Sequence, residues 1–168
     1  MTVSRSRRTV VMGVGNILMG DEGIGVHVIR RLQEQFCGDL ELIEGGTVPA
    51  QSLANPRTVT HLVLVDAVDA GGPPGAVYRI PATEIPRCAV DMSAHHFTLS
   101  DTLTAWHLQG LDMQKAVIIG VQPADVRLRK GLSDTLTHRF SQICDAVLSE
   151  AGHERMTGED DCQRTQAH

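Results

Sequence analysis

Short, continuous runs of apolar residues recur along the chain and are separated by glycine-rich or polar segments. The first run, TVVMGV, is rich in β-branched residues and is typical of a strand buried on both faces. Together the runs predict five strands, the last of them a short edge strand: Thr9–Val14, Leu40–Glu44, His61–Asp66, Lys115–Gly120 and Ala76–Ile80.

Between these strands, apolar residues recur at helical spacing. Residues four positions apart predict a helix over about Gly23–Phe36. A second helix is predicted near Leu99–Gly110, with Thr98 or Ser100 as its N-cap. Ser133 is expected to cap a third, long helix.

Alternating strands and helices predict an α/β fold. Continuous apolar strands of this kind form a twisted, mostly parallel sheet, here of about five strands, flanked by helices on both faces. A chain of 168 residues favours one domain, which we place at residues 1–151. Residues 152–168 are polar and acidic without periodicity, so we expect a disordered, dispensable tail.

Charge and cysteine content exclude several classes of function. The formal net charge is −5, which disfavours a nucleic-acid partner. The four cysteines form no CxxC pair, which argues against a zinc ribbon and indicates reduced thiols of an intracellular protein; they are Cys37, Cys88, Cys144 and Cys162.

No apolar run approaches the ~20 residues that span a bilayer, so we expect no membrane partner. Ser6-Arg7-Arg8 before an apolar stretch is similar to a twin-arginine signal, but Asp21 and Glu22 follow where a small-residue cleavage site would be needed. We therefore expect a cytoplasmic location.

In a parallel sheet, ligands bind beyond the carboxyl ends of the strands, so the loop after the first strand is informative. Its glycines suggest a dinucleotide site, but Leu18 stands where the third glycine of GxGxxG is needed. Asp21 and Glu22 would also repel a pyrophosphate at the start of the helix. Acidic residues there also have an ordinary role, because they complement the helix dipole.

A carboxylate-rich crevice favours a cation instead. Glu22 and Asp66 follow strands that we expect to be neighbours, and His95 lies in a loop with no apolar period to explain it. Taken singly, Asp66 is explained as the cap of its own loop and His95 as a solvated side chain. Together, one imidazole and two carboxylates form a plausible open site for a borderline divalent metal.

Five motifs in order make the chain similar to the nickel–iron hydrogenase maturation proteases. The first loop resembles their GxGNxLxxDEGxG opening, and four further segments resemble (D/E)GGT, (L/V)DAxD, MSxH and GxQP…GLS. In order, these segments are Glu44–Thr47, Leu64–Asp69, Met92–His95, and Gly120–Pro123 with Gly131–Ser133. The resemblance spans about residues 9 to 150.

The resemblance implies an endopeptidase that removes a short C-terminal extension from the hydrogenase large-subunit precursor after nickel insertion. The nickel would then be supplied by the precursor, and its ligands would be Glu22, Asp66 and His95. The MSxH position selects His95 rather than its neighbour His96. We expect the protein to act as a monomer on this partner.

The group that activates the attacking water stays open. A metal-polarised water or carbonyl is one possibility, and general-base action by Asp21, Glu44 or Asp69 is another. A nickel-binding chaperone or sensor that does not cleave the precursor is the alternative function. The four cysteines have no obvious basic partner and are expected to be bystanders.

Overall fold

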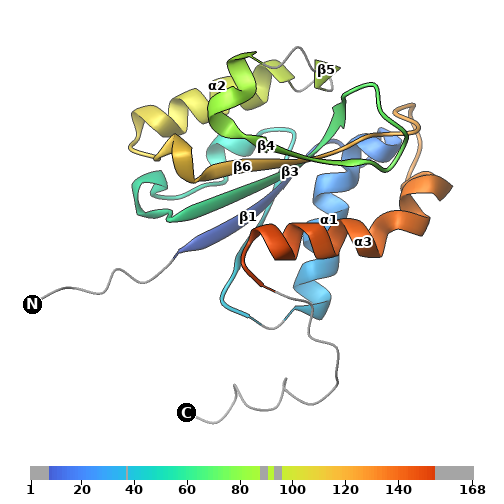
Figure 1. The fold of residues 1–168 in the computed structure, drawn as a ribbon, viewed down its shortest axis with the longest axis horizontal. Coiled ribbons are helices and arrows are strands. Elements are labelled where there is room, and N and C mark those ends of the chain that lie inside the picture. Colours follow the sequence, from blue (N-terminus) through green and yellow to red (C-terminus); the bar gives the residue numbers. More distant parts are fainter. Residues whose placement is uncertain (1–7, 37, 88–90, 93–95, 154–168) are drawn as a thin grey trace, which may run out of the picture.

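The computed structural model describes residues 8–36, 38–87, 91–92 and 96–153. Within them, five strands form a sheet in the order β2-β1-β3-β6-β4, and a short β5 pairs with β3 (Figure 1). The strands are β1 (Thr9–Val14), β2 (Glu41–Gly46), β3 (His61–Asp69), β4 (Val77–Pro81), β5 (Asp91–Met92) and β6 (Ala116–Val121). Strands β2, β1, β3 and β6 are parallel, while β4 runs antiparallel along β6 at the edge. The predicted mostly parallel sheet is confirmed.

Helices cover both faces of the sheet, as expected. Helices α1 (Ile24–Gln35) and α3 (Asp134–Glu150) pack on one face, where they enclose one apolar cluster with the sheet (Figure 1). Helix α2 (His96–Leu108) covers the other face and buries Trp106 in the second cluster. Short 3₁₀ helices complete the chain: η1 (Gly20–Gly23), η2 (Pro49–Gln51), η3 (Pro56–Thr58), η4 (Ala82–Arg87) and η5 (Met113–Lys115).

The predicted bounds of β3 and α2 differ most from the structure, while those of β2, β4 and β6 differ by one or two residues. Strand β3 continues past Asp66 because Ala67 still pairs with β6 and Val68 pairs with β5, so Asp66 lies inside the strand and not at its end. Helix α2 begins at His96, which leaves Thr98 and Ser100 inside it. The apolar period that predicted this helix begins only at Leu99, which is buried. The Ser133 cap is confirmed, since its Oγ accepts a hydrogen bond from the Leu136 N–H (3.3 Å).

Glycines allow the start of α1 to lie directly on the backbone of two strands. A Cβ on Gly25 would overlap the carbonyl oxygens of Val65 and Val14, and a Cβ on Gly13 would overlap the carbonyl of Gly25. No side chain therefore separates this turn of α1 from β1 and β3. This close approach brings η1, which immediately precedes α1, next to the middle of the sheet.

The remaining expectations concern the ends and the cysteines. The apolar stretch after Arg8 forms the buried strand β1, paired on both sides. Past the expected domain boundary, the His153 ring packs edge-on against Phe36 at 5.3 Å, and residues 154–168 lie outside the described part. Cys144 is buried among apolar residues, while the other three cysteines lie outside the described residues. In the described part, no helix is long and apolar enough to cross a bilayer.

Candidate active site

A buried aspartate, Asp66, lies near the carboxyl ends of the parallel strands. Asp66 lies in β3 opposite Gly120 of β6, and its side chain is 0% exposed. Its Oδ1 accepts a hydrogen bond from the Ala67 N–H (2.8 Å), whereas Oδ2 has no hydrogen-bond partner among the described residues. An isolated carboxylate oxygen is costly to bury, so this atom calls for a proton or a cation.

A second buried carboxylate lies beside it. Glu22 belongs to η1 and is 6% exposed. Burial and, as a smaller contribution, the nearby charge of Glu22 together raise the pKa of Asp66 to about 7, against the lowering effect of the hydrogen bond from Ala67. The parallel pairing of β1 with β3 and the close approach of α1 thus place Glu22 near Asp66, while a shared role as metal ligands stays a prediction.

This carboxylate pair fits a divalent cation, which would neutralise both charges and contact Oδ2. Two oxygen donors are only part of a site, and no group of three or more His, Cys, Asp or Glu side chains in the described ranges is placed to hold a metal. The third expected ligand, His95, lies outside the described residues. On either side of it, Met92 pairs with Val68, two residues beyond Asp66, and His96 begins α2.

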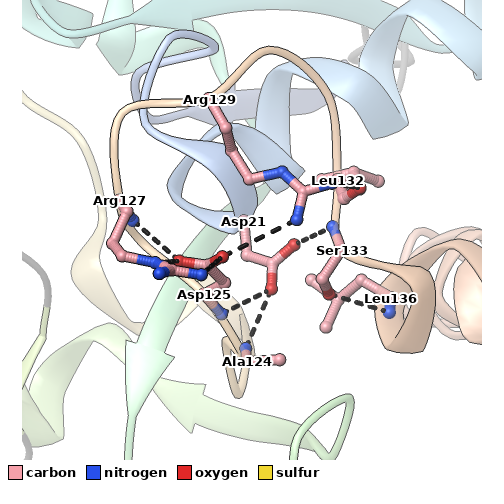
Figure 2. A network of polar contacts seen from close by, with 8 residues as sticks. All are labelled: Asp21, Ala124, Asp125, Arg127, Arg129, Leu132, Ser133 and Leu136. Atoms are coloured by element: carbon pink, nitrogen blue, oxygen red, sulfur yellow. Dashed lines mark hydrogen bonds and ion pairs between the residues drawn. The ribbon is translucent and has the colours of Figure 1, made fainter.

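Asp21, a candidate base, is engaged in a different task. Its Oδ2 accepts hydrogen bonds from the N–H groups of Ala124 (2.9 Å) and Asp125 (3.0 Å), and its Oδ1 accepts one from Ser133 (2.7 Å) (Figure 2). The side chain is 0% exposed. These three bonds tie the loop between β6 and α3 to the loop after β1. They favour a structural role for Asp21 over a general-base role.

Glu44 and Asp69, the other two candidate bases, also have partners. Both oxygens of Glu44 face the guanidinium of Arg30 on α1, with the shortest contact at 3.0 Å. Asp69 accepts hydrogen bonds at Oδ1 from the Gln122 amide (2.9 Å) and the Gly71 N–H (3.1 Å), and these bonds lower its pKa. Asp69 is exposed and thus reachable, but a lowered pKa makes it a weak base.

Gln122 is the structural residue that sequence reasoning did not assign. Its side chain is 6% exposed, its Oε1 accepts bonds from the N–H groups of Ala70 (2.9 Å) and Gly72 (3.3 Å), and its Nε2 donates to Asp69. It thus fixes the turn that leaves β3 shortly after Asp66. The GxQP motif pointed to this position without revealing its contacts, which reach about 50 residues back along the chain.

Comparison with known proteins identifies the family of the chain. The hydrogenase maturation protease family model matches residues 26–150. The hydrogenase 2 maturation protease of Escherichia coli K12 is 30% identical over 146 residues, covering 84% of this chain and 89% of that protein. A hydrogenase expression/formation protein of Cupriavidus necator, HoxM, is 36% identical over 121 residues, which span 70% of this chain and 60% of HoxM.

Solved structures give the same result. The hydrogenase maturating endopeptidase HybD of E. coli superposes with a TM-score of 0.71 at 28% identity, covering 84% of this chain and 90% of HybD. The solution structure of an endopeptidase from E. coli reaches a TM-score of 0.73, also at 28% identity, with coverages of 85% and 91%. With its family model, fold and relatives in agreement, the chain belongs to the hydrogenase maturation protease family and is a maturation endopeptidase.

Proposed function

We propose that the protein removes a C-terminal peptide from the nickel-loaded large-subunit precursor of a nickel–iron hydrogenase. In this proposal Glu22, Asp66 and His95 bind the nickel ion of the precursor and so hold the bond to be cleaved at the site. The observation that carries the proposal is the buried Oδ2 of Asp66, which has Glu22 nearby and no hydrogen-bond partner among the described residues. We further propose that the enzyme is cytoplasmic and acts as a monomer.

The donor set suits a metal that must be recognised but left in place. Carboxylate and imidazole ligands hold a borderline metal less persistently than thiolates do. Of the four cysteines, the described Cys144 is buried between α1, α3 and the sheet, away from the carboxyl ends of the strands. Two oxygens and one nitrogen therefore allow the enzyme to read nickel without extracting it.

Activation of the attacking water is the step with two candidate routes. The oxygens of Asp21 and Glu44 are occupied by backbone N–H groups and by Arg30, respectively, which weakens the case for either as a base. Asp69 is exposed, but its pKa is lowered. We favour polarisation of the water or of the scissile carbonyl by the precursor's nickel, with Asp69 as the remaining candidate base.

The test is to incubate the protein with precursor that either contains nickel or is metal-free and folded, and to follow the precursor's mass. We expect a loss corresponding to a short C-terminal peptide only with nickel-loaded precursor. Equal processing of the metal-free precursor would contradict nickel recognition. Intact precursor in both samples would contradict the proposed substrate.

A further inference from the structure

Large apolar side chains are exposed almost exclusively at one end of the sheet. Six are exposed in the described part of the chain: Leu18, Val48, Val77, Leu108, Val126 and Leu128. Four of them follow the end of a parallel strand: Leu18 follows β1, Val48 follows β2, and Val126 and Leu128 follow β6. Val77 pairs with the last residue of β6. These five therefore lie at the carboxyl ends of the parallel strands, as do Asp66 and Glu22. Only Leu108, at the end of α2, lies toward the opposite end, shortly before β6 begins.

Three of these side chains lie on two loops that backbone hydrogen bonds join, and we call them the apolar rim: Leu18, Val126 and Leu128. Leu18 is 56% exposed, Val126 45% and Leu128 80%. Their two loops are joined, because the Arg129 N–H donates to the Leu18 carbonyl (3.0 Å) and the Gly20 N–H to the Arg129 carbonyl (3.1 Å). The rim therefore spans the loops that follow β1 and β6, the two strands on either side of β3.

The backbone under the rim is held in place from below. Asp21 binds the loop at Ala124, Asp125 and Ser133, and the Asp125 carboxylate in turn pairs with Arg127 at 2.8 Å and with Arg129 at 3.6 Å (Figure 2). A surface that is already ordered loses little conformational entropy when a partner binds. Exposed leucines on a fixed backbone are costly to keep in water and gain free energy when covered.

The charge of this loop is opposite to that of the whole chain. Residues 124–131 contain Arg127, Arg129 and Lys130 against Asp125, a formal charge of 3 − 1 = +2, while the chain carries −5. All three cationic side chains are exposed. The rim and its basic border therefore match a protein surface on which apolar side chains lie beside carboxylates.

We propose that the apolar rim is the docking surface for the hydrogenase large-subunit precursor, which covers it with an apolar patch bordered by acidic residues. This inference rests on the proposed function. Any protein that presents a bond at Asp66 and Glu22 must lie over the loops that surround them, so the rim is contacted whenever the site is used. The rim supplies binding energy, while the buried carboxylates read the metal.

The experiment measures processing kinetics and equilibrium binding of the nickel-loaded precursor with the full chain. Leu18→Ser and Leu128→Ser remove the rim, and Leu108→Ser is the matched control, since Leu108 is 82% exposed at the other end. We expect Leu18→Ser and Leu128→Ser to lower kcat/KM at least fivefold, mainly through KM, and to weaken binding by a similar factor. Leu108→Ser should behave as the unchanged protein.

A charge reversal tests the basic border separately. Lys130→Glu should raise KM, whereas Lys115→Glu, near the start of β6, should not. Thermal melting verifies that all variants fold. Equal kcat/KM and binding for the rim variants and for Leu108→Ser would overturn the docking surface while leaving cleavage intact. If the unchanged protein fails to cleave, the proposed function fails, and the binding comparison still decides whether the rim docks the precursor.

Discussion

At the scale of single residues, two buried aspartates show that burial alone does not identify a functional group. Asp21 and Asp66 are both 0% exposed. Asp21 accepts three backbone hydrogen bonds, while Asp66 accepts one and leaves Oδ2 without a partner in the described part of the chain. The number of hydrogen bonds each carboxylate accepts separates a structural anchor from a side chain with an oxygen available to a proton or a cation.

Replacing Asp66 by Asn should stabilise the metal-free protein in a pH-dependent way. Burial raises the pKa of Asp66 from its ordinary value of 3.8 to about 7, so between these values the native state holds a proton that the unfolded state releases. Native stability therefore falls as the pH rises from about 4 to about 7 and stays low above that. The Asn variant lacks this loss, and its advantage above pH 7 is at most about 4 kcal/mol.

Urea unfolding of both proteins between about pH 5 and about pH 8 measures this difference. Asp69→Asn is the control, because Asp69 is exposed and its pKa is lowered, so its replacement should give no growing advantage at high pH. A stability difference between Asp66→Asn and the unchanged protein that stays flat across this range would contradict the assignment.

Replacing Asp21 by Ala should destabilise the fold strongly. Three backbone N–H groups of the β6–α3 loop would lose their acceptor, at about 1–3 kcal/mol each, for a total of at least about 3 kcal/mol. Asp112→Ala is the matched control, since that exposed aspartate accepts one bond, from the Gln114 N–H, and should cost about 1 kcal/mol or less. Denaturant midpoints compare the two, and similar losses would argue against the anchoring role.

These residue roles could not be read from the sequence because the partners are remote. Asp21 and Glu22 are adjacent acids with the same local explanation at a helix start. The donors to Asp21 lie 103 to 112 residues away, and nothing local marks them as donors. The convergence of Glu22 with Asp66 was predictable, because it needed only two neighbouring parallel strands.

At the scale of elements, the prediction was best where local patterns are strong. The bounds of β1 match the structure, and α3 begins after Ser133, because a buried apolar run and an N-cap are local signals. Strand β5 was missed within an expected loop, since it is two residues long and its pairing partner among the described strands, β3, is remote in the sequence. Its pairing also extends β3 beyond the apolar run that predicted it.

The contact between α1 and the sheet yields a prediction at this scale. Gly25→Ala should push the start of α1 away from β1 and β3, because the new Cβ would overlap the carbonyl oxygens of Val65 and Val14. We expect a loss of at least about 2 kcal/mol in unfolding free energy, as for overpacked cores, together with reduced processing, because Glu22 would move away from Asp66.

The control for this contact is Gly71→Ala. Gly71 has φ 74° and nothing within 4 Å of an added Cβ, so this change costs only the left-handed backbone conformation, about 1–2 kcal/mol. It is a control for stability alone, because the Gly71 N–H donates to Asp69, the remaining candidate base. Normal processing by Gly25→Ala would contradict the view that this contact positions the carboxylates.

At the scale of the whole molecule, the site depends on elements that meet only in the folded sheet. Glu22 lies in η1 after β1, Asp66 in β3, and His95 between β5 and α2 in the sequence. Each residue has an ordinary local explanation when taken alone. The family motifs pointed to all three residues in the sequence. The topology places Glu22 and Asp66 together, while the role of His95 as the third ligand stays a prediction.

The last prediction treats Glu22, Asp66 and His95 as one unit. Glu22→Gln and Asp66→Asn keep the shape but remove charge, and His95→Ala removes the nitrogen donor. Because all three would serve one nickel ion, each single change should remove most of the processing activity, and a double change should add little, as is found for groups that act together. His96→Ala should retain much of its activity. Rates of peptide release from nickel-loaded precursor measure these effects. An inactive His96→Ala variant beside an active His95→Ala variant would assign the ligand to His96 instead of His95. Normal rates for all three ligand variants would refute metal recognition.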